Sequence, residues 1–93
     1  MTIEIDWDDR KAKLNLAKHG VDFTEAASVF FDPLALTYPD GKHSLGESRF
    51  LTFGFSENRR LLVISHVETK KGFRIISARR LTREERKIYE EDR

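Results

Sequence analysis

The pattern of apolar and polar residues predicts strands in the second half of the chain. Three segments are rich in apolar and β-branched residues, and turns of hairpin length separate them. They span residues 49–55, 61–67 and 73–78, and a shorter strand is expected near 34–38. Residues 61–64 and 75–76 are apolar in succession, which is typical of strands with both faces covered. The pattern therefore predicts an antiparallel meander whose last two strands are central.

The first half of the chain predicts a short strand followed by a helix. Apolar and polar residues alternate over 3–7, as in a strand with one buried face. Asp8 then opens a polar segment of good helix formers that ends at Gly20, with Lys18 and His19 in its final turn. An acidic start, a basic last turn and a glycine just beyond are the terminal signals that a helix dipole favours.

Two capping-box patterns predict two further helices. In Asp22-Phe23-Thr24-Glu25 the Asp oxygen is expected to cap the Glu25 amide while Glu25 reaches back, and Asp32-Pro33 ends that helix. Thr82-Arg83-Glu84-Glu85 opens a charged helix that runs through Tyr89. It has so few apolar positions that we expect a lid or an interaction arm. The order of strand, two helices, antiparallel meander and helix predicts an α+β fold.

The composition indicates one small folded domain over residues 1–93. The hydrophobic fraction is 39%, and ten aromatic residues can anchor a modest core. The chain has no cysteine, which excludes disulfides, thiolate zinc sites and a cysteine nucleophile. No segment approaches the roughly 20 apolar residues of a membrane span, and the N-terminus does not begin a signal peptide. We therefore expect a cytoplasmic protein with no membrane partner.

The formal net charge of +1 hides a strong asymmetry along the chain. Residues 1–58 hold six Lys and Arg against ten Asp and Glu, whereas residues 59–93 hold eleven against six. Within 70–83 there are six basic residues and no acidic one. This distribution points to an anionic partner for one region of the molecule.

Several common catalytic patterns are missing. The five glycines are scattered singly, so no glycine-rich phosphate loop is present. The serines at 44, 65 and 77 lack the context of a nucleophile elbow. The three histidines are His19, His43 and His66, which lie 24 and 23 residues apart without the close spacing of metal ligands. We expect neither a metal ion nor a cofactor.

Basic residues and imidazoles remain as the candidate chemistry. Lys11, Asn15 and Lys18 share one face of the first helix, a spacing that fits a solvated polar face as well as a binding face. Arg74 and Arg79 lie five apart on one strand, so regular alternation predicts that they point to opposite faces. One of them is then expected to pair with a carboxylate, and the other to be available for phosphate, which a guanidinium binds with two hydrogen bonds.

This inventory suits metal-free cleavage of RNA. The ribose 2′-OH attacks its own phosphate, so a protein need supply only a base, an acid and positive charge for the phosphorane. A non-catalytic nucleic-acid- or protein-binding module would show the same basic segment at 70–83. Composition and spacing leave both functions open, as they leave His66, inside an apolar strand, open to a core or a catalytic role.

Motifs along nearly the whole chain resemble those of BrnT-type toxins. In the first half they are Trp7-Asp8, Lys11-Ala12, Asn15, Lys18-His19-Gly20-Val21, Phe23, Glu25-Ala26, Val29-Phe30 and Asp32-Pro33. In the second half they are Arg49-Phe50, Gly54, Arg74-Ile75-Ile76-Ser77-Ala78-Arg79 and residues 84–89. The resemblance implies a RelE-like ribonuclease fold and the toxin of a type II toxin–antitoxin module, which inhibits translation by cutting RNA. It also implies a BrnA-like antitoxin partner, a heterotetramer joined by antitoxin dimerisation, and operator DNA bound only through the antitoxin.

Roles for individual residues follow from this resemblance as expectations. We expect Lys18 to position phosphate and His19 to transfer a proton, with Arg49 and Arg79 stabilising the transition-state phosphate. Arg74 is then either a third clamp or structural. The further candidates for RNA binding are Lys11, Arg74, Arg80, His66 and Tyr89.

Overall fold

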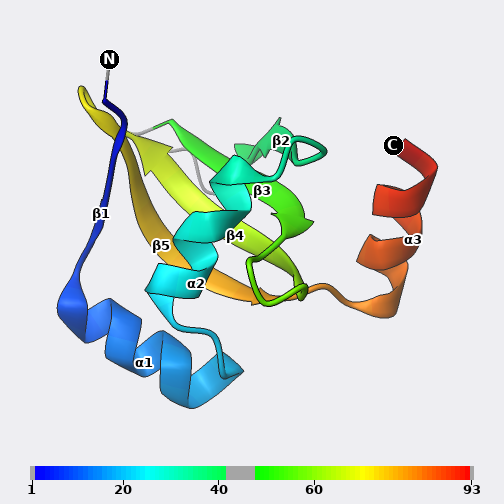
Figure 1. Cartoon of the computed structure of the whole chain (residues 1–93), viewed down its shortest axis with the longest axis horizontal. Coiled ribbons are helices and arrows are strands. Elements are labelled where there is room, and N and C mark those ends of the chain that lie inside the picture. Colours follow the sequence, from blue (N-terminus) through cyan, green and yellow to red (C-terminus); the bar gives the residue numbers. More distant parts are fainter. Residues whose placement is uncertain (1, 42–47, 93) are drawn as a thin grey trace.

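The computed structural model describes residues 2–41 and 48–92 (Figure 1). Its single sheet has five strands in the order β1-β5-β4-β3-β2. The strands are β1 (Glu4–Trp7), β2 (Leu36–Pro39), β3 (Arg49–Phe55), β4 (Leu61–Glu68) and β5 (Gly72–Arg80). The helices are α1 (Asp9–His19), α2 (Phe23–Ser28), the short 3-10 helix η1 (Val29–Phe31) and α3 (Arg83–Asp92). The predicted α+β element order is confirmed.

The sheet joins an antiparallel meander to one parallel strand. Strands β2 to β5 pair antiparallel in sequence order, as predicted, and β4 and β5 have neighbours on both sides. Strand β1 closes the far edge by pairing parallel with β5, Glu4 opposite Gly72 and Trp7 opposite Ile75. Gly72 permits this close approach, because a Cβ atom there would collide with the Glu4 backbone.

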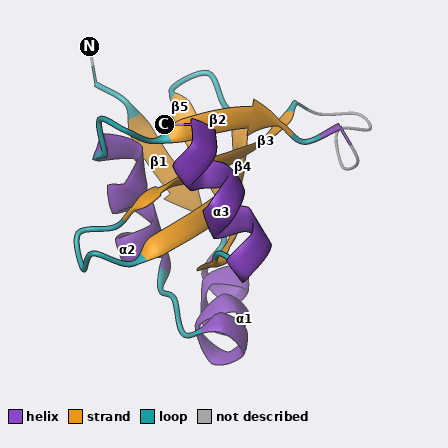
Figure 2. Ribbon diagram, turned by 90° about the vertical axis from the view of Figure 1, so that its right-hand side faces the viewer, coloured by secondary structure: helices purple, strands orange, loops and turns teal. Residues whose placement is uncertain are grey.

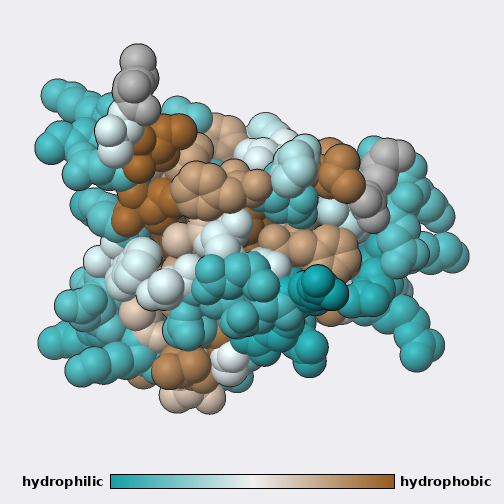
Figure 3. Space-filling model, viewed as in Figure 1, coloured by the Kyte–Doolittle hydropathy of each residue, from teal (hydrophilic) through white to brown (hydrophobic). Residues whose placement is uncertain are grey.

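The main core lies between α2 with η1 and one face of the sheet. Its buried residues are Val21, Phe23, Ala26, Val29, Leu62, Ile64, Ile75 and Ala78. The Trp7 ring meets Phe23 edge-on at a centroid distance of 6.0 Å, which ties β1 to α2. Figure 3 shows the side of the molecule that carries α1 and α2, where hydrophilic residues gather along the flanks and apolar residues are exposed between them.

Helix α1 is held mainly by a polar side chain. Asp8 caps its start by accepting from the Arg10 and Lys11 amides, and Gly20 ends it in the left-handed region at φ 69°. Asn15 is the only residue of α1 that is buried, and its amide bonds to both backbone groups of Ala78 on β5. This hydrogen bonding, rather than a broad apolar face, fixes α1 to the edge of the sheet.

The start of α2 corrects half of the predicted capping box. Asp22 does cap the helix, accepting from the Glu25 amide at 2.7 Å. The Glu25 carboxylate does not reach back, because it accepts from Arg60 Nε at 2.9 Å and from Ser56 Oγ at 2.6 Å. These bonds lower the pKa of Glu25 to about 2 and fasten α2 to the turn between β3 and β4.

Helix α3 lies apart from α1 and α2 and packs beside the other face of the sheet (Figures 1 and 2). The Thr82–Glu85 capping box forms as predicted, with Glu85 N donating to Thr82 Oγ1 and Thr82 N donating to Glu85 Oε1. Tyr89 is 3% exposed, and its ring meets Phe55 at 6.4 Å. The expected interaction arm is therefore anchored by one buried aromatic residue. None of the described helices is both long and apolar enough to cross a membrane.

A β-bulge in β5 overturns the predicted directions of Arg74 and Arg79. Ser65 pairs with Ser77 whereas the next residue, His66, pairs with Ile75, which leaves Ile76 without a partner opposite it. The extra residue shifts the alternation by one position. Arg74 pairs with Val67 and Arg79 with Val63, so both arginines point to the same face of the sheet. That face is the one opposite α2.

Candidate functional site

Three arginines lie on the face of the sheet opposite α2, which we call the arginine face: Arg49, Arg74 and Arg79. Val67 on β4 pairs with Arg49 on β3 and with Arg74 on β5, so the two arginines lie in one row across the sheet. Two strand spacings put their Cα atoms about 10 Å apart. A second row contains Leu51, Ser65 and Ser77, and a third contains Phe53, Val63 and Arg79. The face thus carries guanidinium groups at two ends with hydroxyl groups between them.

Arg79 is held by two hydrogen bonds from α3. Its Nη1 donates to Glu85 Oε1 at 2.8 Å and its Nη2 to Glu85 Oε2 at 2.9 Å. The Arg79 side chain keeps 40% of its surface exposed. Hydrogen bonds from Arg79 are the largest cause of the lowered pKa of Glu85, which falls to about 2. Glu85 is therefore ionised at neutral pH and holds the guanidinium through both of its carboxylate oxygens.

Arg74 has a looser partner than Arg79. Its Nε donates to Asp6 Oδ1 at 3.1 Å, and both side chains are more than half exposed. Pairs this exposed contribute little to stability and exchange readily with an anionic ligand. The sequence predicted that one arginine would be paired and the other available, but in the structure each has a carboxylate partner.

Arg74 and Lys11 line one hollow although they are far apart in sequence. The hollow has a volume of about 350 Å³ and is also lined by Trp7, Asp8, Ile75 and Ile76. It forms where β1 ends and α1 begins to run along the free edge of β5. Two residues that the sequence suggested for RNA binding therefore meet at the bulge.

Lys18 and His19 lie at the other end of α1. Lys11 is level with Arg74, and Asn15 is fixed to Ala78, so the last turn of α1 lies past Ala78. This direction carries Lys18 and His19 toward the end of β5 that bears Arg79. Lys18 is exposed and His19 is partly buried. Asn15, which shares their helix face, is structural.

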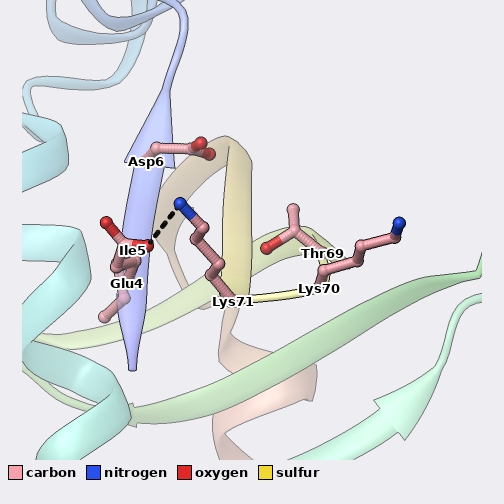
Figure 4. Close-up of a pocket in the computed structure, with 6 residues that line it drawn as sticks. All are labelled: Glu4, Ile5, Asp6, Thr69, Lys70 and Lys71. Atoms are coloured by element: carbon pink, nitrogen blue, oxygen red, sulfur yellow. Dashed lines mark ion pairs between the residues drawn. The ribbon is translucent and has the colours of Figure 1, made fainter. Parts of the chain in front are cut away.

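Arg80 and the tip of the β4–β5 hairpin place other basic residues away from the arginine face. Arg80 is exposed and pairs with Leu62 on the opposite face from Arg79. A hollow of about 540 Å³ beside the hairpin is lined by Glu4, Ile5, Asp6, Thr69, Lys70 and Lys71. In Figure 4, Lys71 extends toward Glu4, with Nζ 3.6 Å from Oε2, whereas Lys70 points away. The basic segment 70–83 is thus spread over several surfaces.

His66 is part of a buried aromatic cluster. It is 2% exposed, and Phe30, Phe50 and Phe73 lie around its ring at centroid distances of 4.8 to 6.0 Å. Its Nε2 lies 2.7 Å from Thr52 Oγ1, and its Nδ1 has no hydrogen-bond partner within the described part of the chain. Burial lowers its pKa to about 4, so the ring is neutral at physiological pH.

Two of the residues expected to contact RNA are buried. His66 lies beneath the surface, and Tyr89 is covered where α3 meets β3. Both side chains are buried in this structure, and their role in RNA binding stays a prediction. Sequence reasoning also missed Asp6 and Glu85, the acidic partners of Arg74 and Arg79. The only sequence signal that pointed to Glu85 was the capping box, and no pattern near Asp6 predicted that it would pair with Arg74. His43 lies outside the described residues.

The fold and this site define a class: a small α+β domain that presents an arginine-bearing sheet face, with a terminal helix at its margin. The model of the family described as "Ribonuclease toxin, BrnT, of type II toxin-antitoxin system" matches residues 7–85. The chain belongs to this family of ribonuclease toxins, and a type II toxin implies an antitoxin partner.

A solved structure agrees with this assignment at the level of the fold. The 1.1 Å crystal structure of the Brucella abortus ribonuclease toxin BrnT matches with a TM-score of 0.68 at 24% sequence identity. The match covers 88% of this chain and 100% of the Brucella chain. No curated protein matches the sequence.

Proposed function

We propose that the arginine face is the catalytic surface of this toxin and that it cleaves RNA without a metal ion. The observation that carries the proposal is the bulge at Ile76, which brings Arg74 and Arg79 to the face that Arg49 also occupies, in a chain of a ribonuclease family. Guanidinium groups on one surface can contact the scissile phosphate and its neighbours together. Because the ion pair between Arg74 and Asp6 is exposed, Arg74 can exchange the Asp6 carboxylate for a phosphate group of RNA.

In the proposed reaction the ribose 2′-oxygen attacks the adjacent phosphorus and the P–O5′ bond breaks. The products are a 2′,3′-cyclic phosphate and a free 5′-hydroxyl, so the nucleophile comes from RNA. Arg49 and Arg79 stabilise the extra negative charge of the phosphorane. His19 transfers the proton of the 2′-hydroxyl to the departing 5′-oxygen, and Lys18 positions a flanking phosphate, from the end of α1 that runs toward Arg79.

The proposal extends to the biological setting. Cleavage of RNA in the cytoplasm inhibits translation, and a BrnA-like antitoxin neutralises the toxin in a heterotetramer. Operator DNA is bound only through the antitoxin. Size-exclusion chromatography with light scattering on the co-purified complex tests the stoichiometry, and a mass other than two copies of each chain contradicts it.

Cleavage of a defined single-stranded RNA tests the catalytic proposal. The purified chain is expected to cut in EDTA and to leave a cyclic phosphate, which mass spectrometry identifies. Arg79→Ala and Arg49→Ala should abolish cutting, whereas Arg86→Ala, which removes the same charge from the exposed side of α3, should not. Retained cutting by both site variants, or a strict need for added metal, contradicts the proposal. Salt-sensitive binding without product favours the non-catalytic alternative that uses residues 70–83.

A further inference from the structure

Exposed apolar side chains gather on the side of the molecule where η1, β2, β3 and α3 meet. We call it the apolar band, and its members are Phe31, Leu34, Tyr38, Phe55 and Ile88. Phe31 is 76% exposed and Ile88 is 57% exposed, which is unusual for large apolar residues of so small a domain. Exposed apolar patches of this kind mark sites of protein interaction.

Two hollows and the buried Tyr89 connect members of the apolar band. Phe31 and Phe55 line one hollow of about 420 Å³. Phe55 meets Tyr89 edge-on, and the Tyr89 hydroxyl reaches the Leu34 carbonyl at 3.5 Å. A second, smaller hollow of about 60 Å³ is lined by Tyr38, Phe53, Glu85, Ile88 and Tyr89. The two hollows therefore lie on either side of the aromatic contact between β3 and α3.

The charge of the larger hollow is negative. Asp32 and Glu57 line it together with the two phenylalanines, and none of the described residues that line either hollow is Lys, Arg or His. The Asp32 carboxylate accepts from the Leu34 and Phe55 amides at 2.9 and 2.8 Å, which fixes it in place without cancelling its charge. Glu57 is exposed and makes no ion pair within residues 2–41 and 48–92.

We propose that the apolar band docks the antitoxin through a segment that bears a Lys or Arg side chain flanked by apolar residues. The cation enters the hollow between Phe31 and Phe55, where it gains the two carboxylates and the aromatic faces. The apolar neighbours cover Leu34 and Ile88. Negative charge disfavours RNA on this surface, in contrast to the arginine face.

The band also touches the catalytic surface at one residue. Glu85 lines the smaller hollow and holds Arg79 through both carboxylate oxygens. A segment seated on the band therefore contacts the residue that orients Arg79. The inference rests on the proposed function in one respect only, which is that the partner is the antitoxin of a toxin–antitoxin module.

The affinity of the chain for its BrnA-like antitoxin tests this surface. Both proteins are purified in full length, and calorimetry compares two band variants with two matched controls. Phe31→Asp is matched by Leu14→Asp, since Leu14 is 64% exposed on α1, and Glu57→Lys is matched by Glu68→Lys at the exposed end of β4. Phe31→Asp should weaken binding by about 30-fold or more. Glu57→Lys should weaken it by about tenfold, and the controls by less than about twofold.

The possible results separate this surface from the proposed function. Band variants that bind like wild type, controls that lose equally, or no complex at all would overturn the docking proposal. Self-association of the wild type that Phe31→Asp abolishes would also overturn it, because the band would then join two copies of the chain. The predicted loss of binding in a chain that cuts no RNA supports the docking surface while the catalytic proposal fails.

Discussion

The Asn15 side chain completes the hydrogen bonding of Ala78 at the edge of β5. Its Nδ2 donates to the Ala78 carbonyl at 2.8 Å, and its Oδ1 accepts from the Ala78 amide at 3.0 Å. The same Nδ2 donates to the Val21 carbonyl at 3.0 Å. Strand β1 has ended by this level, so one amide side chain takes the place of a neighbouring strand. It thereby fixes the distance between α1 and Arg79.

Asn15→Ala is expected to lower the free energy of unfolding by about 3 kcal/mol, because it leaves several buried backbone groups without partners. Asn15→Asp keeps the acceptor for the Ala78 amide but loses both donated bonds, so it should be comparably harmful. Urea unfolding measures these losses, with Lys13→Ala on the exposed side of α1 as the control. A loss below about 1 kcal/mol in both Asn15 variants would contradict this role.

Arg79→Lys separates charge from geometry at the arginine face. Lysine keeps the positive charge but cannot make the two parallel bonds that Arg79 makes to Glu85, nor offer the same fork to phosphate. We expect kcat/KM for RNA cleavage to fall by about 100-fold, with a melting temperature close to that of wild type. Single-turnover cleavage and thermal unfolding check the two parts, and unchanged cleavage would remove Arg79 from the catalytic set.

His66 should make the fold sensitive to mild acid. Its folded pKa of about 4 lies below the ordinary value of 6.5, so the unfolded chain binds more protons between these limits. The contribution of His66 to the free energy of unfolding is therefore fully present above about pH 6.5. It is lost as the pH falls toward 4, by roughly 2–3 kcal/mol in all. Urea unfolding at several pH values measures this slope.

Replacing His66 by a neutral residue tests whether His66 causes this loss of stability in acid. His66→Gln should remove most of the slope between pH 6.5 and 4.5 even though it lowers stability at pH 7. The carboxylates with strongly lowered pKa values, Glu25 and Glu85 at about 2, contribute only below about pH 4.5, where they begin to bind protons in the unfolded chain. An unchanged slope in His66→Gln would assign the acid sensitivity to other groups.

Arg60→Ala is expected to cost about 3–5 kcal/mol, because it leaves the Glu25 carboxylate buried without its cation. The double variant with Glu25→Gln as well should recover part of that loss, since the remaining amide carries no charge. Thermal unfolding of the two single variants and the double variant measures the coupling. Additive losses would show that the pair does not act as a unit.

Local patterns were sufficient for the elements but not for the pairing of distant residues. Alternation, capping boxes and turn lengths predicted the strands β1 to β5 and the helices α1, α2 and α3. Those signals act over only a few residues. The bulge at Ile76 was not predicted, because two successive apolar residues at 75–76 fit a central strand with or without an extra residue. Its consequence was the wrong prediction for Arg74 and Arg79.

The candidate site was predictable in its basic residues and not in their partners. Arginines in a strand signal phosphate binding by their chemistry alone. Asp6 meets Arg74 across 68 positions of sequence, and only the parallel pairing of β1 with β5 brings them together. The burial of His66 and Tyr89 depends likewise on aromatic residues from other elements, which no spacing along the chain reveals.

The place of β5 in the sheet has a consequence for the chain as it is synthesised. Strand β5 is the last strand in the sequence, yet it lies between β1 and β4 and carries two of the three arginines. A nascent polypeptide that stops before residue 80 therefore has neither a completed sheet nor an assembled arginine face. A ribosome must therefore translate through residue 80 before the arginine face of the toxin can form.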